Sequence, residues 1–229
     1  TESGVEIECS AKVIDIDADE SGVQVIDING RKLKADYFLS NAAPEFVSAK
    51  IKNRESLEGS QIKINMLLTR LPKLKSGIDP KLAFAGTFHI DESFSELERA
   101  YDQALMGEIP DQIPAEMYCH TLTDPSILSP ELQESGFQTL TLFGLHTPAT
   151  AFEEENKNTT NLVMKRALAG LNKYLAEPIE EVIAKGKDGK LCIEAKSPLD
   201  LEADIYLPRG NIFHKDLTLP FAESDNEVG

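Results

Sequence analysis

The sequence has few of the residues and runs that mark several protein classes. Its 229 residues include no tryptophan, three cysteines and 23 basic residues against 39 acidic ones, a formal net charge of -16. This negative charge repels phosphate backbones and anionic lipid, so nucleic acid is not an expected partner. A membrane span needs roughly 18 to 20 apolar residues, and the run at 62–68 is interrupted by Lys63 and Asn65. We expect no transmembrane segment.

The three cysteines, Cys9, Cys119 and Cys192, are widely spaced and form no C-x-x-C pair. This pattern argues against a disulfide framework and a zinc site, and it favours reduced thiols packed as small hydrophobes in a cytoplasmic compartment. The chain starts with neither Met nor the basic and apolar regions of a signal peptide. We therefore expect a piece of a longer cytoplasmic protein whose true termini lie elsewhere.

Motifs that carry chemistry by themselves are missing. The sequence contains neither G-x-G-x-x-G nor G-x-x-x-x-G-K-[ST], so no segment predicts a phosphate-binding loop. No G-x-S-x-G marks a nucleophilic serine. The histidines lie on separate segments without H-E-x-x-H spacing, at His89, His120, His146 and His214. We expect no metal site and no catalytic triad built from protein side chains alone.

The first block, residues 5–39, has a strong strand pattern. Val5, Ile7 and Cys9 alternate with polar residues, and two later apolar stretches flank Asn29-Gly30. This dipeptide accepts the two positive φ angles of a type I′ hairpin turn. The pattern predicts an antiparallel β-meander, followed by a short helix at residues 44–51 because Pro44 favours a helix start. The polar stretch that follows predicts a domain boundary near Asn53.

The remaining pattern mixes strands and helices. Alternation predicts strands at residues 61–70, 81–90, 117–122 and 138–146. Helical spacing predicts helices at 94–105, after a capping box at Ser93, and at 160–175, with a short helix from Pro178. The fold class predicted is α+β: a small antiparallel β-meander at 1–53, a mixed β-sheet domain with packed helices at 54–222, and a connection at 223–229.

Several motifs resemble one known family. They are the first block through Ser40-Asn-Ala-Ala-Pro44 and the later stretches Thr121-Leu-Thr-Asp-Pro-Ser126, Ser197-Pro-Leu-Asp-Leu201 and Gly210-Asn-Ile-Phe-His214. Together they resemble the phytoene desaturase-like branch of two-domain FAD-dependent oxidoreductases, which includes carotenoid desaturases and the pyridine nucleotide-disulphide oxidoreductase domain 2 proteins. The likeness covers nearly the whole chain.

The resemblance implies a place for each part of the chain. Residues 1–53 correspond to the β-meander portion of the FAD-binding domain, and residues 54–222 correspond to the substrate domain. Val13 would face the adenine of FAD, and Asn41 and Ala42 would lie beside the cofactor where the chain leaves the FAD domain. Asn211 and His214 would line the substrate side near the flavin.

The family's glycine-rich loop and its second flavin-contacting motif are absent from this sequence. FAD is therefore expected in the intact parent and not on this piece alone, which we expect to be inactive. The expected partners are the missing FAD-binding segments of the same chain and a small-molecule substrate. The parent would remove hydride from an apolar or amphipathic substrate, with the flavin supplying the chemistry. The alternative is a standalone binding or scaffold module that holds no cofactor.

Overall fold

A computed structural model of the chain describes residues 3–19, 22–27, 30–43 and 58–213. The chain divides into two compact units, Thr1–Ser56 and Leu57–Gly229. The domain boundary expected near Asn53 and the helix expected at residues 44–51 lie outside the described residues, so both stay predictions.

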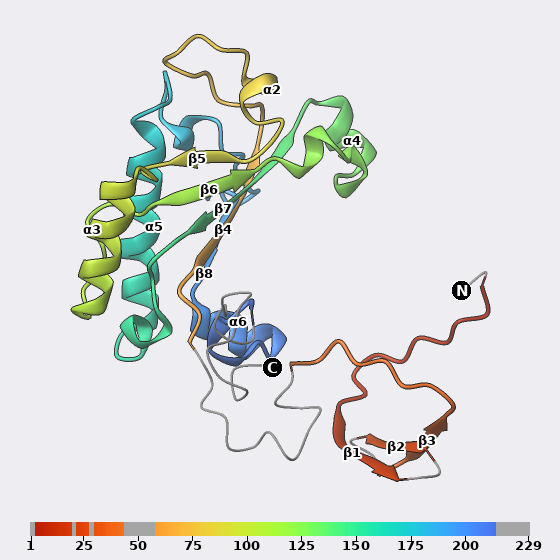
Figure 1. Cartoon of the computed structure of the whole chain (residues 1–229). Coiled ribbons are helices and arrows are strands. Elements are labelled where there is room, and N and C mark those ends of the chain that lie inside the picture. Colours follow the sequence, from red (N-terminus) through yellow and green to blue (C-terminus); the bar gives the residue numbers. More distant parts are fainter. Residues whose placement is uncertain (1–2, 20–21, 28–29, 44–57, 214–229) are drawn as a thin grey trace. The chain divides into compact units, whose positions relative to one another are not determined.

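The first unit contains a three-stranded antiparallel sheet. Strands β1 (Val13–Asp19), β2 (Gly22–Asp27) and β3 (Lys32–Ala35) pair in the order β1-β2-β3 (Figure 1). The predicted meander is confirmed for these strands. Gly30 has a positive φ of +73°, but Ile26 is paired with Lys32, which leaves an odd number of residues between them. The predicted two-residue turn at Asn29-Gly30 is therefore wrong.

Two parts of the predicted strand pattern are wrong. Val5 and Ile7 lie in irregular chain and are 56% and 74% exposed, and β3 ends before Tyr37 and Leu39, which are 90% and 95% exposed. Alternation alone does not make a strand, because a strand also needs a neighbour with which to exchange hydrogen bonds. In the described residues, β2 is the central strand and pairs on both sides with β1 and β3.

The second unit is built on a five-stranded sheet. Strands β4 (Ile62–Leu68), β5 (Phe88–Ile90), β6 (Ala115–Tyr118), β7 (Gln138–Gly144) and β8 (Ile193–Lys196) lie in the order β5-β6-β7-β4-β8. The α+β class is confirmed. Each described strand pair is antiparallel, which refines the expected mixed sheet. The alternation predicted in β4 is confirmed, since Ile62, Ile64, Met66 and Leu68 are buried and the residues between them are half-buried.

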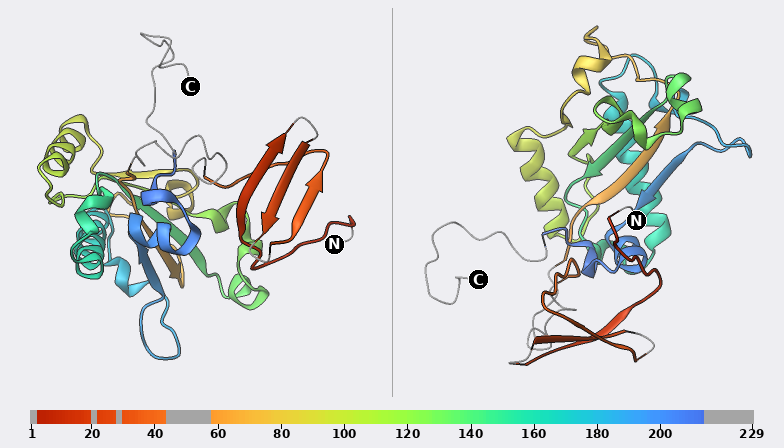
Figure 2. Two further views of the ribbon diagram at one scale, coloured as in Figure 1. Left: turned by 90° about the horizontal axis from the view of Figure 1, so that it is seen from below. Right: turned by 90° about the vertical axis from the view of Figure 1, so that its right-hand side faces the viewer.

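Helices lie around this sheet (Figure 1). They are α2 (Pro80–Ala83), α3 (Phe94–Leu105), α4 (Pro130–Glu134), α5 (Asn156–Asn172) and α6 (Pro198–Ile205). Figures 1 and 2 show α3 and α5 on the same side of the sheet. Val163, Ala167 and Leu171 of α5 are fully buried in the core with the buried face of β4, as helical spacing predicts.

Short elements correct two strand predictions. Pro80 opens α2 after Asp79, whose side chain accepts a hydrogen bond from the Lys81 amide, so only β5 remains of the strand expected at 81–90. The strand expected at 117–122 ends at Tyr118, and the 3-10 helix η2 (His120–Leu122) follows.

The capping box at Ser93 and Glu96, which starts α3, is confirmed. The apolar stripe of α3 is largely exposed, with Phe94 at 82% and Leu105 at 67%.

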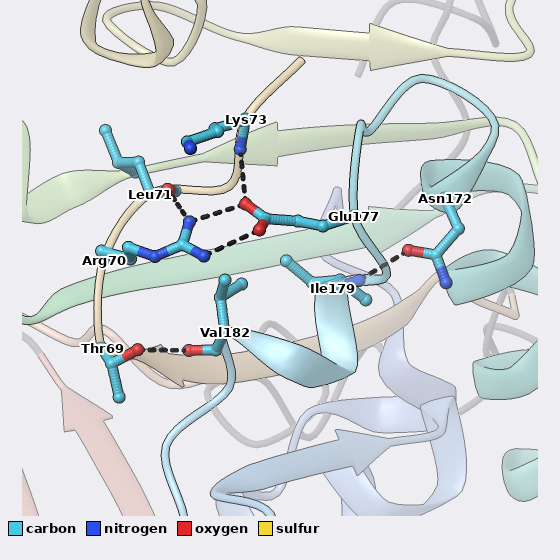
Figure 3. Close-up of polar contacts among 8 residues, drawn as sticks. All are labelled: Thr69, Arg70, Leu71, Lys73, Asn172, Glu177, Ile179 and Val182. Atoms are coloured by element: carbon cyan, nitrogen blue, oxygen red, sulfur yellow. Dashed lines mark hydrogen bonds and ion pairs between the residues drawn. The ribbon is translucent and has the colours of Figure 1, made fainter. Parts of the chain in front are cut away.

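A cluster of polar contacts fastens the chain after α5 to the loop after β4 (Figure 3). The Arg70 guanidinium donates to both carboxylate oxygens of Glu177 at 2.6 and 2.7 Å, and the Lys73 amide donates to the same carboxylate at 3.0 Å. Asn172, at the end of α5, accepts from the Ile179 amide at 2.8 Å. The hydrogen bond from Arg70 is the largest cause that lowers the pKa of Glu177 to about 2.

The Glu177 contact predicts a pH-dependent contribution to stability. A carboxylate whose pKa falls on folding stabilises the protein above its unfolded pKa and loses that effect as pH falls through the folded one. Glu177→Gln should therefore lower the free energy of unfolding by about 1 kcal/mol at neutral pH, because Arg70 is half exposed and solvent weakens the pair. Urea titrations should show this difference constant above pH 5 and vanishing toward pH 2. A constant difference at all pH values would contradict the assignment.

Candidate functional site

The second face of the sheet, here called the open sheet face, carries the half-buried polar and aromatic side chains of the strands. The strand register brings them into rows, because residues directly opposite in antiparallel strands point to the same face. One row crosses all five strands and consists of Lys196, Lys63, Phe143, Glu116 and His89. The next row consists of Glu194, Asn65, Thr141 and Tyr118. In the described residues, α3 and α5 lie on the opposite side (Figure 2).

Contacts between the rows hold these side chains in place. The Thr141 hydroxyl donates to the Asn65 side-chain oxygen at 3.1 Å. The Tyr118 ring packs edge-on against Phe143, with 5.8 Å between ring centroids, and stacks on His120 at 6.0 Å. Burial is the main cause that raises the pKa of Tyr118, so its hydroxyl stays protonated at neutral pH. The face therefore presents an ordered aromatic and polar surface.

A groove of about 540 Å³ runs along this face over β4, β7 and β8. Its lining mixes polar side chains with apolar ones, and it consists of Asn65, Met66, Leu67, His120, Ile127, Thr139, Thr141, Leu191, Cys192, Ile193 and Glu194. Such a concave surface with a few placed polar groups is typical of a small-molecule site.

The motif Thr121-Leu-Thr-Asp-Pro-Ser126 lies between two residues that line the groove, His120 and Ile127. The Thr121 hydroxyl donates to Gln138 at 2.7 Å and accepts from the Thr139 amide at 3.0 Å, which ties η2 to the start of β7. Asp124 accepts from the Ser126 amide at 3.0 Å and caps the 3-10 helix η3 (Pro125–Ile127). These contacts place His120 and Ile127, which flank the motif, at the groove.

The other motifs in the second unit have local structural roles. Ser197 and Asp200 form the capping box of α6, and Asn156 donates to Asp200 at 2.8 Å. Asn211 is buried, and its side-chain oxygen accepts from the Phe213 amide at 2.9 Å. His214 lies outside the described residues, so its predicted role stays a prediction.

The candidate cofactor residues lie in the first unit. Val13 begins β1, the outer strand of the three-stranded sheet, and is 45% exposed. Asn41 and Ala42 lie in exposed irregular chain, where the Ala42 amide donates to the Ser40 hydroxyl at 3.2 Å. A strand edge can offer backbone groups to an adenine, but the sequence has no glycine loop for a pyrophosphate. This chain alone does not fit a complete FAD site.

The alternation at residues 61–70 predicts a strand with one solvated face. Sequence reasoning missed the neighbours of Lys63 and Asn65 on that face, because they come from strands distant in the sequence. The packing predicted for the cysteines is confirmed for Cys119, which is buried, and wrong for Cys9, which is exposed, while Cys192 is half-buried. Within the described ranges no cluster of three metal-binding side chains occurs, and no helix is long and apolar enough to cross a membrane.

The second unit defines a class of structure: an antiparallel sheet with two long helices on one face and a groove on the other (Figure 2). No protein-family model matches the chain. It is 47% identical over 171 residues to uncharacterized proteins of Mycobacterium tuberculosis and Mycobacterium bovis, covering 74% of this chain and 32% of each relative.

More distant relatives have a descriptive name. The rat and mouse proteins called pyridine nucleotide-disulfide oxidoreductase domain-containing protein 2 are 27% identical to the chain over 214 and 215 residues, which is 83% of this chain and 34% of each relative. The chain thus spans about a third of the length of the curated relatives that it matches. These relatives support an oxidoreductase-related function.

Proposed function

We propose that this chain supplies the substrate-facing wall of an FAD-dependent oxidoreductase that removes hydride from an apolar or amphipathic molecule. The observation that carries the proposal is the grooved open sheet face, to which the residues that flank the Thr121–Ser126 motif contribute. The distant relatives named as oxidoreductases support the same class.

The side chains of the groove suit binding and positioning. Asn65 and Thr141 offer hydrogen bonds, while Leu67, Ile127 and Leu191 offer apolar contact. When bound, FAD would accept the hydride; this chain's residues would bind and orient the substrate and exclude water. In this proposal, Val13, Asn41 and Ala42 contact the cofactor, and Asn211 and His214 lie toward the substrate.

The test uses a protein that contains this chain at the full length of its relatives. We expect it to be purified yellow with bound FAD, and its flavin to be reduced by substrate in the absence of oxygen. Asn65→Leu should slow this reduction roughly tenfold while the FAD content stays constant, because it removes a positioning group at the groove. The readout is stopped-flow loss of flavin absorbance.

Asn161→Leu is the matched control, since Asn161 lies exposed on α5, on the other side of the sheet. It should leave the rate unchanged. Equal rates of flavin reduction in the two variants would show that the open sheet face is not part of the substrate site. A colourless full-length protein would overturn the proposed function and favour the cofactor-free binding module.

A further inference from the structure

Two lysines face each other across the edge of the open sheet face. Lys63 of β4 is paired in register with Lys196 of β8, so their side chains leave the same face of the sheet. Directly opposite side chains in antiparallel strands have Cβ atoms about 5 Å apart, and like charges in such positions repel each other. The register therefore places two ammonium-bearing side chains next to each other at this edge of the face.

The two lysines differ in their partners. Lys196 is neutralised by Asp204 at 2.7 Å and by Glu194 at 3.2 Å. Lys63 lies over the Phe143 ring, with its ammonium 5.7 Å from the ring centroid, and makes no ion pair with any residue that the structure describes. A half-buried ammonium beside an aromatic ring and a second lysine is a place for an anion.

Two carboxylates of this face have partners among the described residues. Glu194 pairs with Lys196, and Glu92 lies 2.6 Å from the Nδ1 atom of His89. Glu116 lies in the same row as Lys63 but two strands away, with Phe143 between them. Lys63 is therefore the lysine of these rows without a carboxylate partner among the described residues, and its end of the face favours a ligand with a negative group.

The groove provides room for the rest of such a ligand. From Lys63 the face continues along β4 through Asn65 to Leu67, a distance of roughly 13 Å at the rise of an extended strand. Asn65 and Leu67 line the groove, and Ile127 and Leu191 line it as well. The face is thus polar at the lysine pair and apolar at the other end of the groove, at Leu67, Ile127 and Leu191.

We propose that the open sheet face binds an amphipathic aliphatic acid, with its carboxylate at Lys63 and its chain along the groove toward Ile127 and Leu191. This inference rests on the proposed function in treating the face as the substrate wall. The site is nevertheless built entirely from residues of this chain. It names the substrate class, which the likeness to an oxidoreductase family leaves open.

The experiment measures binding of decanoate, decanol and decylamine to the isotope-labelled chain by NMR titration. Decanoate should bind saturably, shift signals of β4, β8 and η3, and bind more weakly at high salt. Lys63→Gln should weaken decanoate binding roughly tenfold or more, because a charge-assisted hydrogen bond is lost. Decanol should bind more weakly than decanoate and be insensitive to the substitution.

Lys165→Gln is the matched control, because Lys165 is an exposed lysine on α5. It should leave decanoate binding unchanged, and all variants should have the melting temperature of the parent chain. Absence of saturable decanoate binding, equal binding by Lys63→Gln, or preference for decanol or decylamine would overturn the inference. The titration needs no flavin, so a colourless full-length protein would defeat the proposed function alone.

Discussion

Replacing Gly210 with alanine should lower the free energy of unfolding of the second unit by about 3 kcal/mol or more. Gly210 has a φ of +67°, and a Cβ atom added there would lie 2.5 Å from the Cα of Pro198 and 2.7 Å from its Cβ. Two costs therefore add: about 1 to 2 kcal/mol for a left-handed non-glycine residue, and the displacement of backbone at the start of α6. Urea unfolding followed by circular dichroism measures the sum.

Gly136→Ala separates these two costs. Gly136 has a similar φ of +78°, but a Cβ atom there would meet nothing within 4 Å. In this control variant the free energy of unfolding should fall by only about 1 to 2 kcal/mol, the conformational cost of a left-handed alanine. If both variants lose the same stability, the close approach of Gly210 to Pro198 does not limit the fold.

The expected result also bears on the motif Gly210-Asn-Ile-Phe-His214. Gly59 approaches the Gly210 carbonyl so closely that its own Cβ would lie 2.3 Å from that oxygen, and its amide donates to the Arg209 carbonyl at 2.9 Å. The start of the motif thus docks against the chain just before β4. This close packing explains why position 210 needs glycine. It does not bear on the proposed roles of Asn211 and His214.

The sequence pattern predicted the elements that carry a clear signal within their own residues. The helix α3 has its capping box at Ser93, the α5 helix has its buried stripe, and β4 alternates as expected. The helix α6 was missed although Ser197 and Asp200 form a capping box at its start, which is a local signal. The strand β8 was missed because it has only four residues, without a buried alternation, and is defined by its pairing with β4. Short elements depend on tertiary partners that no local window contains.

The candidate site was less predictable than the fold. Asn65 and Thr141 are hydrogen-bonded neighbours 76 positions apart in the sequence, and Lys63 and Lys196 meet only through the strand register. A sequence pattern shows that a strand has two faces, but not which strands lie beside it. The structure places His120 and Ile127, which flank the Thr121–Ser126 motif, at the groove.

Replacing Lys173 with methionine should lower the free energy of unfolding by about 3 kcal/mol, because it leaves a buried carboxylate without its countercharge. The Asp91 side chain is only 2% exposed and lies 3.1 Å from the Lys173 ammonium. The Tyr174 hydroxyl donates to the same carboxylate at 3.1 Å. Burial and the Asp91 charge together raise the pKa of Tyr174, which keeps this donor protonated. The contact ties the turn before α3 to the end of α5.

Replacing Asp91 should lower the free energy of unfolding less than replacing Lys173 does. This difference between the two variants is the more discriminating test. Asp91 has a left-handed φ of +53°, which asparagine tolerates well. Asp91→Asn should therefore cost about 1 kcal/mol, since Lys173 is 46% exposed and water solvates its charge. Lys190→Met, which breaks an exposed pair with Asp188, should leave the stability nearly unchanged. Urea unfolding at neutral pH ranks the three variants. A larger loss for Asp91→Asn than for Lys173→Met would show that the aspartate acts through backbone geometry and not as a buried charge.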